Sequence, residues 1–207
     1  AAPLRDETPC LPRTPYGRTK LRAEEIVREQ GVKSGYRHTI LRLCTVYGPG
    51  YRTGGMFEVL PKILRKQSLV ARVAWPGRMS LVFLEDLARL LLAIPGEQRT
   101  EDRTFLVSSG EDPSFGDIAA QVARVHGLDH RPISLSSVAE RFARRVTGTW
   151  PLWKHAPYSI MIAAWRASLL LEGLFCDGTE LTRLLGIRYL PWQEGFKRMY
   201  DVRERPA

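Results

Sequence analysis

Residues 39–50 read TILRLCTVYGPG, an apolar run that ends in a turn rich in glycine and proline. The β-branched and apolar residues from Thr39 to Val46 predict a buried strand. The glycines and the proline of Tyr47-Gly48-Pro49-Gly50 predict that this strand runs into a loop. The elements on either side of this strand decide the fold class.

Strand and helix patterns alternate on the carboxyl side of this stretch. Strands are expected at residues 69–73, 80–84 and 104–108, and helices at residues 58–67, 87–94 and 114–125. Pro61 is tolerated only in a first turn, which puts the start of the first helix near Leu60. Asp86 is expected to cap the second helix, and Ser114 with Asp117 matches a capping box on the third. The alternation predicts a mostly parallel sheet.

One more helix is expected before the strand, at residues 15–30. Thr14 is its predicted N-cap, Pro15 occupies the first helical position, and Gly31 follows the predicted end. The residues before Thr14 form a polar connector rich in proline.

After about residue 131 the patterns become helical. Helices are expected at residues 136–146, 158–172 and 178–185, and from Pro191 onward. Asp177 and Glu180 have capping-box spacing, and Gly186 marks a helix end. We therefore expect a smaller, mainly helical lobe to follow the α/β part.

The net charge of +9, from 31 basic and 22 acidic residues, raises the question of nucleic-acid binding. Of the basic residues, 25 are arginines spread along the chain, and no short stretch is dominated by Lys and Arg. The densest cluster, Arg141, Arg144 and Arg145, lies on a predicted helix with an apolar opposite face, made of Leu135, Val138, Phe142 and Val146. A solvated helix face is the favoured interpretation, with nucleic-acid binding as a distant alternative.

The most apolar window, residues 158–176, contains Arg166 and Glu172. A buried or groove-lining helix is therefore favoured there over a membrane anchor. The three cysteines are far apart and have no histidine at ligand spacing; they are Cys10, Cys44 and Cys176. This favours a reducing, cytoplasmic location without a metal site.

The sharpest chemical pattern is Tyr16-Gly17-Arg18-Thr19-Lys20, at the start of the helix expected at residues 15–30. Residues four positions apart share a helical face, so the ammonium of Lys20 can lie near the hydroxyl of Tyr16. A free phenol has a pKa of about 10 and is a weak base at neutral pH. A neighbouring cation favours the phenolate, which suits such a pair to move a proton at a substrate hydroxyl.

Further motifs accompany this pattern. They are Glu7-x-Pro9-x-x-Pro12 before it, then Leu41-Arg42 with Val46-Tyr47-Gly48-Pro49-Gly50, then Val82-x-x-Glu85-Asp86-Leu87-Ala88, and finally Asp177–Gly186 followed by Pro191–Tyr200. In order and spacing, over nearly its whole length, the chain resembles the extended short-chain dehydrogenase/reductases, the NAD-dependent epimerase/dehydratase family.

The resemblance implies a Rossmann domain that binds NAD or NADP. Tyr16 matches the catalytic tyrosine of the family, and Lys20 matches its partner, which also hydrogen-bonds the nicotinamide ribose. Leu43 and Val46, around the end of the buried strand, are expected to border the cofactor. The cofactor supplies the redox chemistry in such proteins, and Tyr16 would move the proton.

Thr45 and Arg78 are the candidate substrate contacts. Thr45 stands where sugar-nucleotide epimerases and dehydratases commonly have Asn, and Ser80 stands where many have Asp. Arg78 can still bind a phosphate or a carboxylate. These departures slightly favour reductases and steroid-dehydrogenase-like members of the family. A sugar nucleotide and a steroid- or flavonoid-like alcohol therefore both remain candidate substrates.

The largest departure from the family lies upstream of Tyr16. Family members open with a strand, a glycine-rich phosphate turn and a helix, and carry a Ser or Thr that neither Thr8 nor Thr14 matches. The resemblance thus implies an N-terminally truncated fragment, inactive alone. Residues 1–130 would hold the C-terminal portion of a Rossmann-like doubly wound parallel sheet with interleaved substrate-lobe segments, and residues 131–207 the mainly helical substrate-binding lobe.

The loop Gly48-x-Gly50-x-x-x-Gly54-Gly55 also follows a strand and precedes a helix, as a phosphate-binding loop does. Its spacing is not G-x-G-x-x-G, and Pro49 has no N–H to offer a phosphate. A loop near the nicotinamide and the substrate is the favoured interpretation.

Two classes of function follow. The first is an NAD(P)-dependent oxidoreductase or epimerase acting on a hydroxyl or carbonyl of a small molecule. The second is a non-catalytic Rossmann-fold protein that retains the fold for interaction. A small-molecule substrate is expected, without nucleic acid, metal or stable membrane insertion, and a homodimer is an open alternative.

Overall fold

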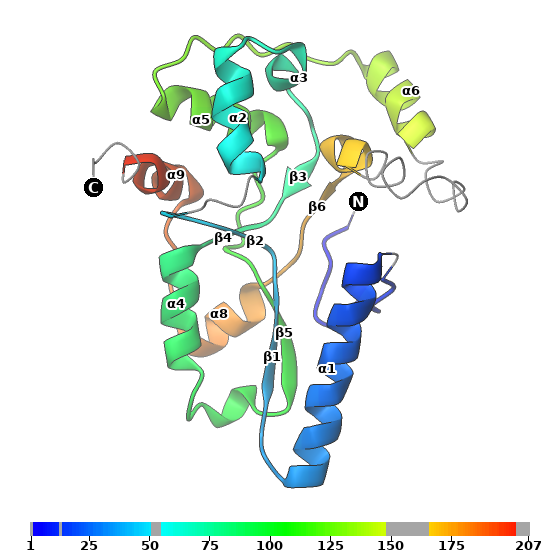
Figure 1. Cartoon of the computed structure of the whole chain (residues 1–207), viewed down its shortest axis with the longest axis vertical. Coiled ribbons are helices and arrows are strands. Elements are labelled where there is room, and N and C mark those ends of the chain that lie inside the picture. The colour runs from blue at the N-terminus through cyan, green and yellow to red at the C-terminus, as the bar shows by residue number, and fades with distance from the viewer. Residues whose placement is uncertain (1, 13, 51–54, 148–165, 202–207) are drawn as a thin grey trace.

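The computed structural model describes the whole chain except residues 1, 13, 51–54, 148–165 and 202–207 (Figure 1). Its strands form short parallel pairs. Strand β1 (Thr39–Leu43) pairs with β5 (Arg103–Val107), β2 (Thr45–Tyr47) pairs with β4 (Leu81–Phe83), and β3 (Arg78–Met79) pairs with β6 (Gly173–Leu174). The parallel α/β arrangement predicted from the sequence is confirmed.

The strand expected at residues 39–46 exists as two segments that change partner. Leu41 of β1 is in register with Phe105 of β5, whereas Val46 of β2 is in register with Val82 of β4. Between the two segments, the N–H of Cys44 donates to the carbonyl of Val107 over 3.1 Å. One chain segment therefore links two strand pairs.

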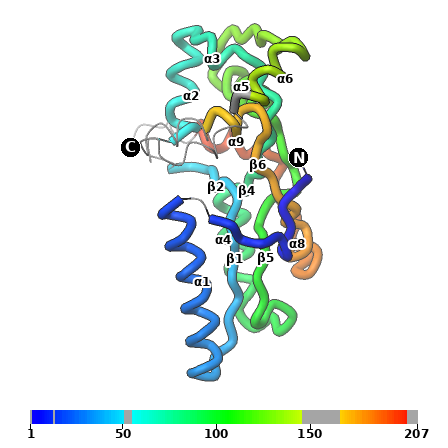
Figure 2. The backbone as a smooth tube through the Cα atoms, turned by 90° about the vertical axis from the view of Figure 1, so that its right-hand side faces the viewer, coloured from blue at the N-terminus to red at the C-terminus, as the bar shows by residue number. Residues whose placement is uncertain are grey.

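Helices cover both faces of the β1–β5 pair (Figures 1 and 2). Helix α1 (Pro15–Ser34) lies along one face, and α4 (Leu84–Ala93) and α8 (Thr179–Leu185) lie along the other. The core under α4 and α8 consists of apolar side chains that are at most 6% exposed: Val82, Leu87, Leu90, Phe105, Val107 and Leu181. The lower part of the molecule in Figure 1 is thus a three-layer sandwich.

The upper part is mainly helical. Helices α2 (Met56–Arg65), α5 (Phe115–Val125) and α9 (Trp192–Asp201) surround a second core, and α3 (Leu69–Arg72) and α6 (Ser137–Thr147) lie at the outer end (Figure 1). This core is aromatic, with buried rings of Tyr47, Phe57, Phe83, Phe196 and Tyr200. The rings of Tyr47 and Phe196 stack with centroids 4.8 Å apart, which packs α9 onto the end of β2.

Helix α1 begins where the sequence predicts and ends later. The Thr14 hydroxyl accepts from the N–H of Gly17 over 3.1 Å, which confirms the N-cap. The predicted end before Gly31 is wrong, because the helix runs to Ser34 and stops at Gly35, which has φ of +70°. Gly31 instead allows a close approach of the returning chain, since a Cβ there would lie 2.9 Å from Nδ1 of His38.

Helix α2 begins at Met56, not near Leu60 as Pro61 predicts. Pro61 has no N–H to donate to the Phe57 carbonyl four residues earlier. The Tyr200 hydroxyl donates to that carbonyl over 2.7 Å. A side chain from α9 thus compensates for the proline and allows α2 to begin a turn earlier.

Two further expectations about elements are wrong. Residues 69–72 form the single helical turn α3 instead of a strand, and only Val73 makes a bridge, to Ile133. Helix α4 has Phe83 as its N-cap, while Asp86 lies buried in its first turn. The Asp86 carboxylate accepts from the N–H of Leu190 over 2.9 Å and thereby tethers the C-terminal segment to α4.

The later helices follow the sequence patterns with one change in capping. The capping box of Ser114 with Asp117 and the helix end at Gly186 are confirmed. Asp177 makes no capping box, since it accepts from Thr179 while Gly178 is the N-cap of α8. Of the helix expected at residues 158–172, residues 166–172 are helical and the rest lies outside the described residues. No helix in the described ranges is long and apolar enough to cross a membrane.

Candidate functional site

The start of α1 positions the Tyr16 and Lys20 side chains. Pro15 and the Thr14 cap fix the first turn, where Tyr16 lies. A Cβ on Gly17 would lie 3.0 Å from the Cβ of Pro12, so the connector passes directly against this turn. The site is therefore built by one capped helix end and the segment that leads into it.

The structure brings Tyr16 and Lys20 together. The Nζ of Lys20 lies over the Tyr16 ring, 5.4 Å from its centroid, a cation–π contact. This contact is with the ring face, whereas the spacing alone suggested the hydroxyl. The Tyr16 side chain is 70% exposed, and Lys20 is exposed as well. Both functional groups are thus accessible to a ligand.

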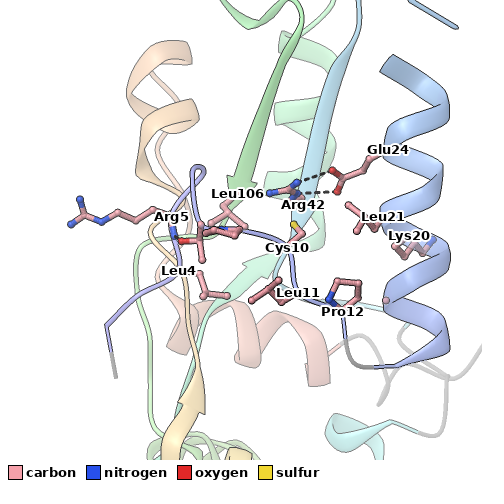
Figure 3. Close-up of a pocket in the computed structure, with 13 residues that line it drawn as sticks. Leu4, Arg5, Cys10, Leu11, Pro12, Lys20, Leu21, Glu24, Arg42 and Leu106 are labelled. Atoms are coloured by element: carbon pink, nitrogen blue, oxygen red, sulfur yellow. Dashed lines mark hydrogen bonds and ion pairs between the residues drawn. The ribbon is translucent and has the colours of Figure 1, made fainter. Parts of the chain in front are cut away.

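A cavity of about 420 Å³ lies beside Lys20, between α1, the connector and the strands (Figure 3), and Tyr16 is not among the residues that line it. Its lining is mostly apolar with a few charged groups: Leu4, Arg5, Thr8, Pro9, Cys10, Leu11, Pro12, Gly17, Lys20, Leu21, Glu24, Arg42 and Leu106. Leu21 and Glu24 of α1 face the connector and Arg42 across it (Figure 3). An apolar cavity with convergent charges has the character of a small-molecule site.

Glu24 and Arg42 form the charged wall of this cavity (Figure 3). Arg42 donates to both carboxylate oxygens of Glu24, from Nε over 2.9 Å and from Nη2 over 2.8 Å. Arg28 donates to Glu24 over 3.0 Å and also to Thr104 of β5 over 3.0 Å. The bonds from Arg42 hold the pKa of Glu24 below its usual range, and those from Glu24 raise the pKa of Arg42. The network fixes α1 against both strands.

The connector is bound to the rest of the molecule by backbone hydrogen bonds. The N–H of Leu4 donates to Phe175 over 3.0 Å, and the N–H of Asp177 donates to Leu4 over 2.8 Å. The Asp6 carboxylate accepts from the N–H of Leu106 over 2.6 Å. Burial, followed by the nearby Glu180, raises the pKa of Asp6 despite that bond. The connector thus forms a fixed wall of the cavity.

Leu43, Thr45 and Val46 lie together at the crossing between β1 and β2. Leu43 is 47% exposed, whereas Thr45 and Val46 are half-buried. The N–H of Thr45 donates to the Ser80 carbonyl over 3.3 Å. These three residues are not in the lining of the cavity beside Lys20.

Arg78 lies on β3, in a different part of the structure. Its Nε donates to the Asp112 carbonyl over 3.0 Å, its Nη2 lies 3.6 Å from the Asp112 carboxylate, and its guanidinium lies 4.9 Å from the centroid of the Phe175 ring. Within the described residues, no hydrogen bond or ion pair joins Arg78 to Tyr16 or Lys20. The described part of the chain also contains no group of three or more His, Cys, Asp and Glu side chains that could hold a metal ion.

Sequence reasoning missed Glu24 and Asp6. Glu24 lies four residues after Lys20, so the spacing that linked Tyr16 with Lys20 would have extended to it. Arg42 belongs to the Leu41-Arg42 motif, but this motif does not show which residue pairs with Arg42. Asp6 and Leu106 are 100 positions apart, and no local pattern links them.

Residues 1–107 match the pattern of the NAD dependent epimerase/dehydratase family. A similar curated protein is the UDP-glucose 4-epimerase of Azospirillum brasilense, 36% identical over 76 residues, which are 35% of this chain and 22% of that protein. Among solved structures, the UDP-glucuronic acid 4-epimerase of Bacillus cereus, in complex with UDP-glucuronic acid and NAD, superimposes with a TM-score of 0.68 at 18% identity. The superposition covers 98% of this chain and 56% of that chain.

A second similar structure is RMD from Pseudomonas aeruginosa, complexed with NADPH. It superimposes with a TM-score of 0.68 at 15% identity, over 98% of this chain and 60% of that chain. The chain therefore spans just over half the length of these two structures. The matched residues 1–107 are more than half of the 207-residue chain and include the Tyr16–Lys20 pair, the connector and both strands beside α1. This protein belongs to the NAD-dependent epimerase/dehydratase family, the extended short-chain dehydrogenase/reductases.

Proposed function

We propose that this chain forms the nicotinamide- and substrate-facing part of an NAD(P)-dependent enzyme that acts on a hydroxyl or carbonyl of a sugar nucleotide. The observation that carries the proposal is the pairing of Tyr16 with Lys20 at a capped helix start beside an apolar cavity. The names of the similar proteins support the substrate class, since they act on or bind UDP-sugars.

In this proposal Tyr16 moves the proton at the substrate hydroxyl, because its phenol is an exposed acid–base group beside the Lys20 ammonium. Lys20 holds a positive charge over the Tyr16 ring and offers its three N–H donors to a ribose. Leu43 and Val46 border the cofactor, and Thr45 contacts the substrate, in keeping with their places at the end of β1 and on β2. Arg78 binds a phosphate or carboxylate of the substrate.

The described residues fit one end of a dinucleotide. The exposed Tyr16 hydroxyl and Lys20 ammonium lie at one helix start, where a ribose could take hydrogen bonds from both. The bound cofactor would accept or return a hydride. The sequence contains no G-x-G-x-x-G turn for a pyrophosphate. We propose that residues outside this chain bind the pyrophosphate, and we leave NAD and NADP open.

We likewise propose that residues 1–130 hold the C-terminal portion of the doubly wound sheet with interleaved substrate-lobe segments, and that residues 131–207 form the mainly helical substrate lobe, except for α8, which packs on the β1–β5 pair. The chain's coverage of just over half of two similar structures supports the view that it forms part of the family fold. The second function, a non-catalytic protein that keeps the fold for interaction, is favoured only if Tyr16 and Lys20 prove dispensable.

The test is made in the whole protein encoded by the gene, with UDP-sugars as substrates and NAD or NADP supplied. Tyr16→Phe keeps the ring but removes the hydroxyl, so turnover should fall by about 10²- to 10⁴-fold while cofactor affinity changes little. Lys20→Ala should weaken cofactor binding as well as turnover, because it removes a donor and a charge. Tyr36→Phe, on a half-exposed tyrosine near the other end of α1, is the control and should leave both unchanged.

Turnover and cofactor binding together distinguish the catalytic function from the non-catalytic one. Loss of turnover in Tyr16→Phe with cofactor binding intact supports the catalytic assignment. A Tyr16→Phe variant as active as wild type would contradict it. If the whole protein binds neither NAD nor NADP, the non-catalytic function replaces the proposal.

A further inference from the structure

In the part of the chain that the structure describes, helix α6 has an exposed apolar stripe. Val138 and Phe142 lie four positions apart, on one helical face, and are 66% and 69% exposed. Both residues belong to the apolar face of this helix, opposite its arginines. Burying a phenylalanine side chain is worth about 1.5–3 kcal/mol, so leaving it in water is unfavourable. A surface that covers the stripe would therefore gain this free energy.

A second exposed apolar group lies at the same end of the molecule. Leu69 and Val70 of α3 are 68% and 58% exposed. The N–H of Ala74 donates to the Ile133 carbonyl over 2.9 Å, and the N–H of Ile133 donates to Arg72 over 2.7 Å. These bonds tie the end of α3 to the segment that leads into α6. Both helices lie at the outer end of the helical part (Figures 1 and 2), and we call this region the α3–α6 end.

The α3–α6 end is strongly basic. Residues 65–72 and 129–145 contain seven basic and two acidic residues, so these 25 positions carry more than half of the net charge of +9. Both acidic residues already have basic partners, since Asp129 lies 3.3 Å from Arg131 and Glu140 lies 2.7 Å from Arg144. The remaining basic residues are Arg65, Lys66, Arg72, Arg141 and Arg145.

We propose that the α3–α6 end docks on the surface of an anionic phospholipid membrane. Exposed apolar side chains flanked by arginines are what an interfacial helix presents, with the apolar groups at the acyl boundary and the cations at the headgroups. The attachment is peripheral, and it needs no helix that spans the bilayer. Val138 and Phe142 would enter the interface, while Arg141 and Arg145 would bind the headgroup phosphates.

The charges favour a lipid surface over two other partners. A second copy of the chain would bring the same excess of positive charge to the contact, which is repulsive. A nucleic acid would match the charge, but its phosphates would leave Phe142 and Val138 without an apolar partner. An anionic bilayer satisfies both features of the surface.

The experiment is flotation of the 207-residue protein with vesicles at 100 mM salt. Vesicles of phosphatidylcholine with about one third phosphatidylglycerol should bind the protein, and vesicles of phosphatidylcholine alone should bind it weakly. Arg141→Gln with Arg145→Gln should lower partitioning to the anionic vesicles on the order of 30-fold. Val138→Ser with Phe142→Ser should lower it by roughly tenfold or more.

Matched controls change exposed residues of the same kinds elsewhere. Val32→Ser with Leu92→Ser removes two side chains that are 87% and 82% exposed on α1 and α4. Lys33→Gln with Arg183→Gln removes two exposed charges on α1 and α8. Both control pairs should bind vesicles within about twofold of wild type. Far-UV circular dichroism and melting temperature verify that each variant is folded.

Three results would overturn the proposal. One is the absence of binding to anionic vesicles. Another is binding that the two control pairs weaken as much as the α3–α6 pairs do, which indicates unspecific attraction of a basic protein. The third is a dimer in analytical ultracentrifugation that Val138→Ser with Phe142→Ser dissociates, since a second copy would then be the partner.

Discussion

At the scale of single residues, Glu24 links the Tyr16–Lys20 site to the sheet. Its side chain is 16% exposed, and its carboxylate accepts from two arginines, one on β1 and one on its own helix. Arg28 continues the network to Thr104 on β5. The rotation of α1 about its axis, and with it the direction of Tyr16 and Lys20, depends on these bonds.

Replacing Glu24 by Gln should destabilise the protein by about 1–2 kcal/mol at pH 7, because Arg42 loses a charged acceptor in a partly buried position. The pKa of Glu24 is lowered in the folded protein, chiefly by Arg42. Its stabilising contribution is therefore complete above the ordinary glutamate pKa and is lost as the pH falls through the folded value. The difference from wild type should shrink below about pH 4, as urea unfolding at several pH values would show.

Glu29→Gln is the control for this measurement. Glu29 pairs with Arg22 over 3.1 Å, but its side chain is 47% exposed, so the loss should stay within about 0.5 kcal/mol. Amide exchange of α1 gives a second readout, because the helix should open more often in Glu24→Gln. Equal effects of the two variants would show that the Glu24 network does not hold α1.

Single residues were predictable where a local spacing carried the information. Tyr16 and Lys20 were found from their positions on one helix, and the structure places them in contact. The role of Asp86 was mistaken, since its partner Leu190 is 104 positions away. An aspartate can cap a helix or accept a hydrogen bond from a distant part of the chain, and only the folded structure shows which role it has.

At the scale of elements, the sequence predicted most helices and strands but not all their ends. Residues 69–73 are apolar enough for a strand, but a strand needs a neighbouring strand that hydrogen-bonds its backbone N–H and C=O groups. In the turn α3 the bonds form within the segment, because the N–H of Arg72 donates to the Ser68 carbonyl and the N–H of Val73 donates to the Leu69 carbonyl. The start of α2 likewise depends on Tyr200, which lies 143 positions after Phe57. Such partners are set by the tertiary fold, which periodicity does not encode.

Helix α9 gives the prediction that belongs to this scale. A Cβ on Gly195 would lie 2.2 Å from the Tyr47 hydroxyl and 2.9 Å from its Cζ, closer than atoms can approach. Gly195→Ala should therefore push α9 away from β2 and destabilise the protein by about 2–4 kcal/mol. This exceeds the gain of about 1 kcal/mol that alanine brings to a helix interior. Thermal and urea unfolding measure the net change.

Two further variants identify the cause. Tyr47→Phe in the Gly195→Ala background removes the nearest atom but leaves Cζ at 2.9 Å, so the rescue should be partial. Lys197→Ala, on the exposed side of α9, should change stability by less than about 0.5 kcal/mol. If Gly195→Ala were as stable as wild type, α9 would not pack as closely on Tyr47 as described.

At the scale of the whole molecule, the chain has the accessible Tyr16–Lys20 pair but only part of the residues that a dinucleotide-binding site requires. Its superposition covers 56% of the Bacillus cereus epimerase. Pyrophosphate binding in Rossmann folds uses a glycine-rich turn whose N–H groups and helix N-terminus meet the phosphates. The sequence has no such turn, and the loop after β2 offers Pro49 where a donor would be needed.

The 207-residue chain alone should therefore fail to bind NADH or NADPH with micromolar affinity. Fluorescence titration tests this, with the Bacillus cereus UDP-glucuronic acid 4-epimerase as the positive control because its structure contains NAD. The net charge of +9 will attract any anion weakly, so the titration is made at about 0.5 M salt, where exposed charges are screened. Residual binding should be equal for wild type and Lys20→Ala, since without phosphate contacts the ribose contact alone is too weak to hold the cofactor. Saturable micromolar binding that Lys20→Ala weakens would contradict this expectation, and would mean that the chain binds the phosphates by residues other than a glycine-rich turn.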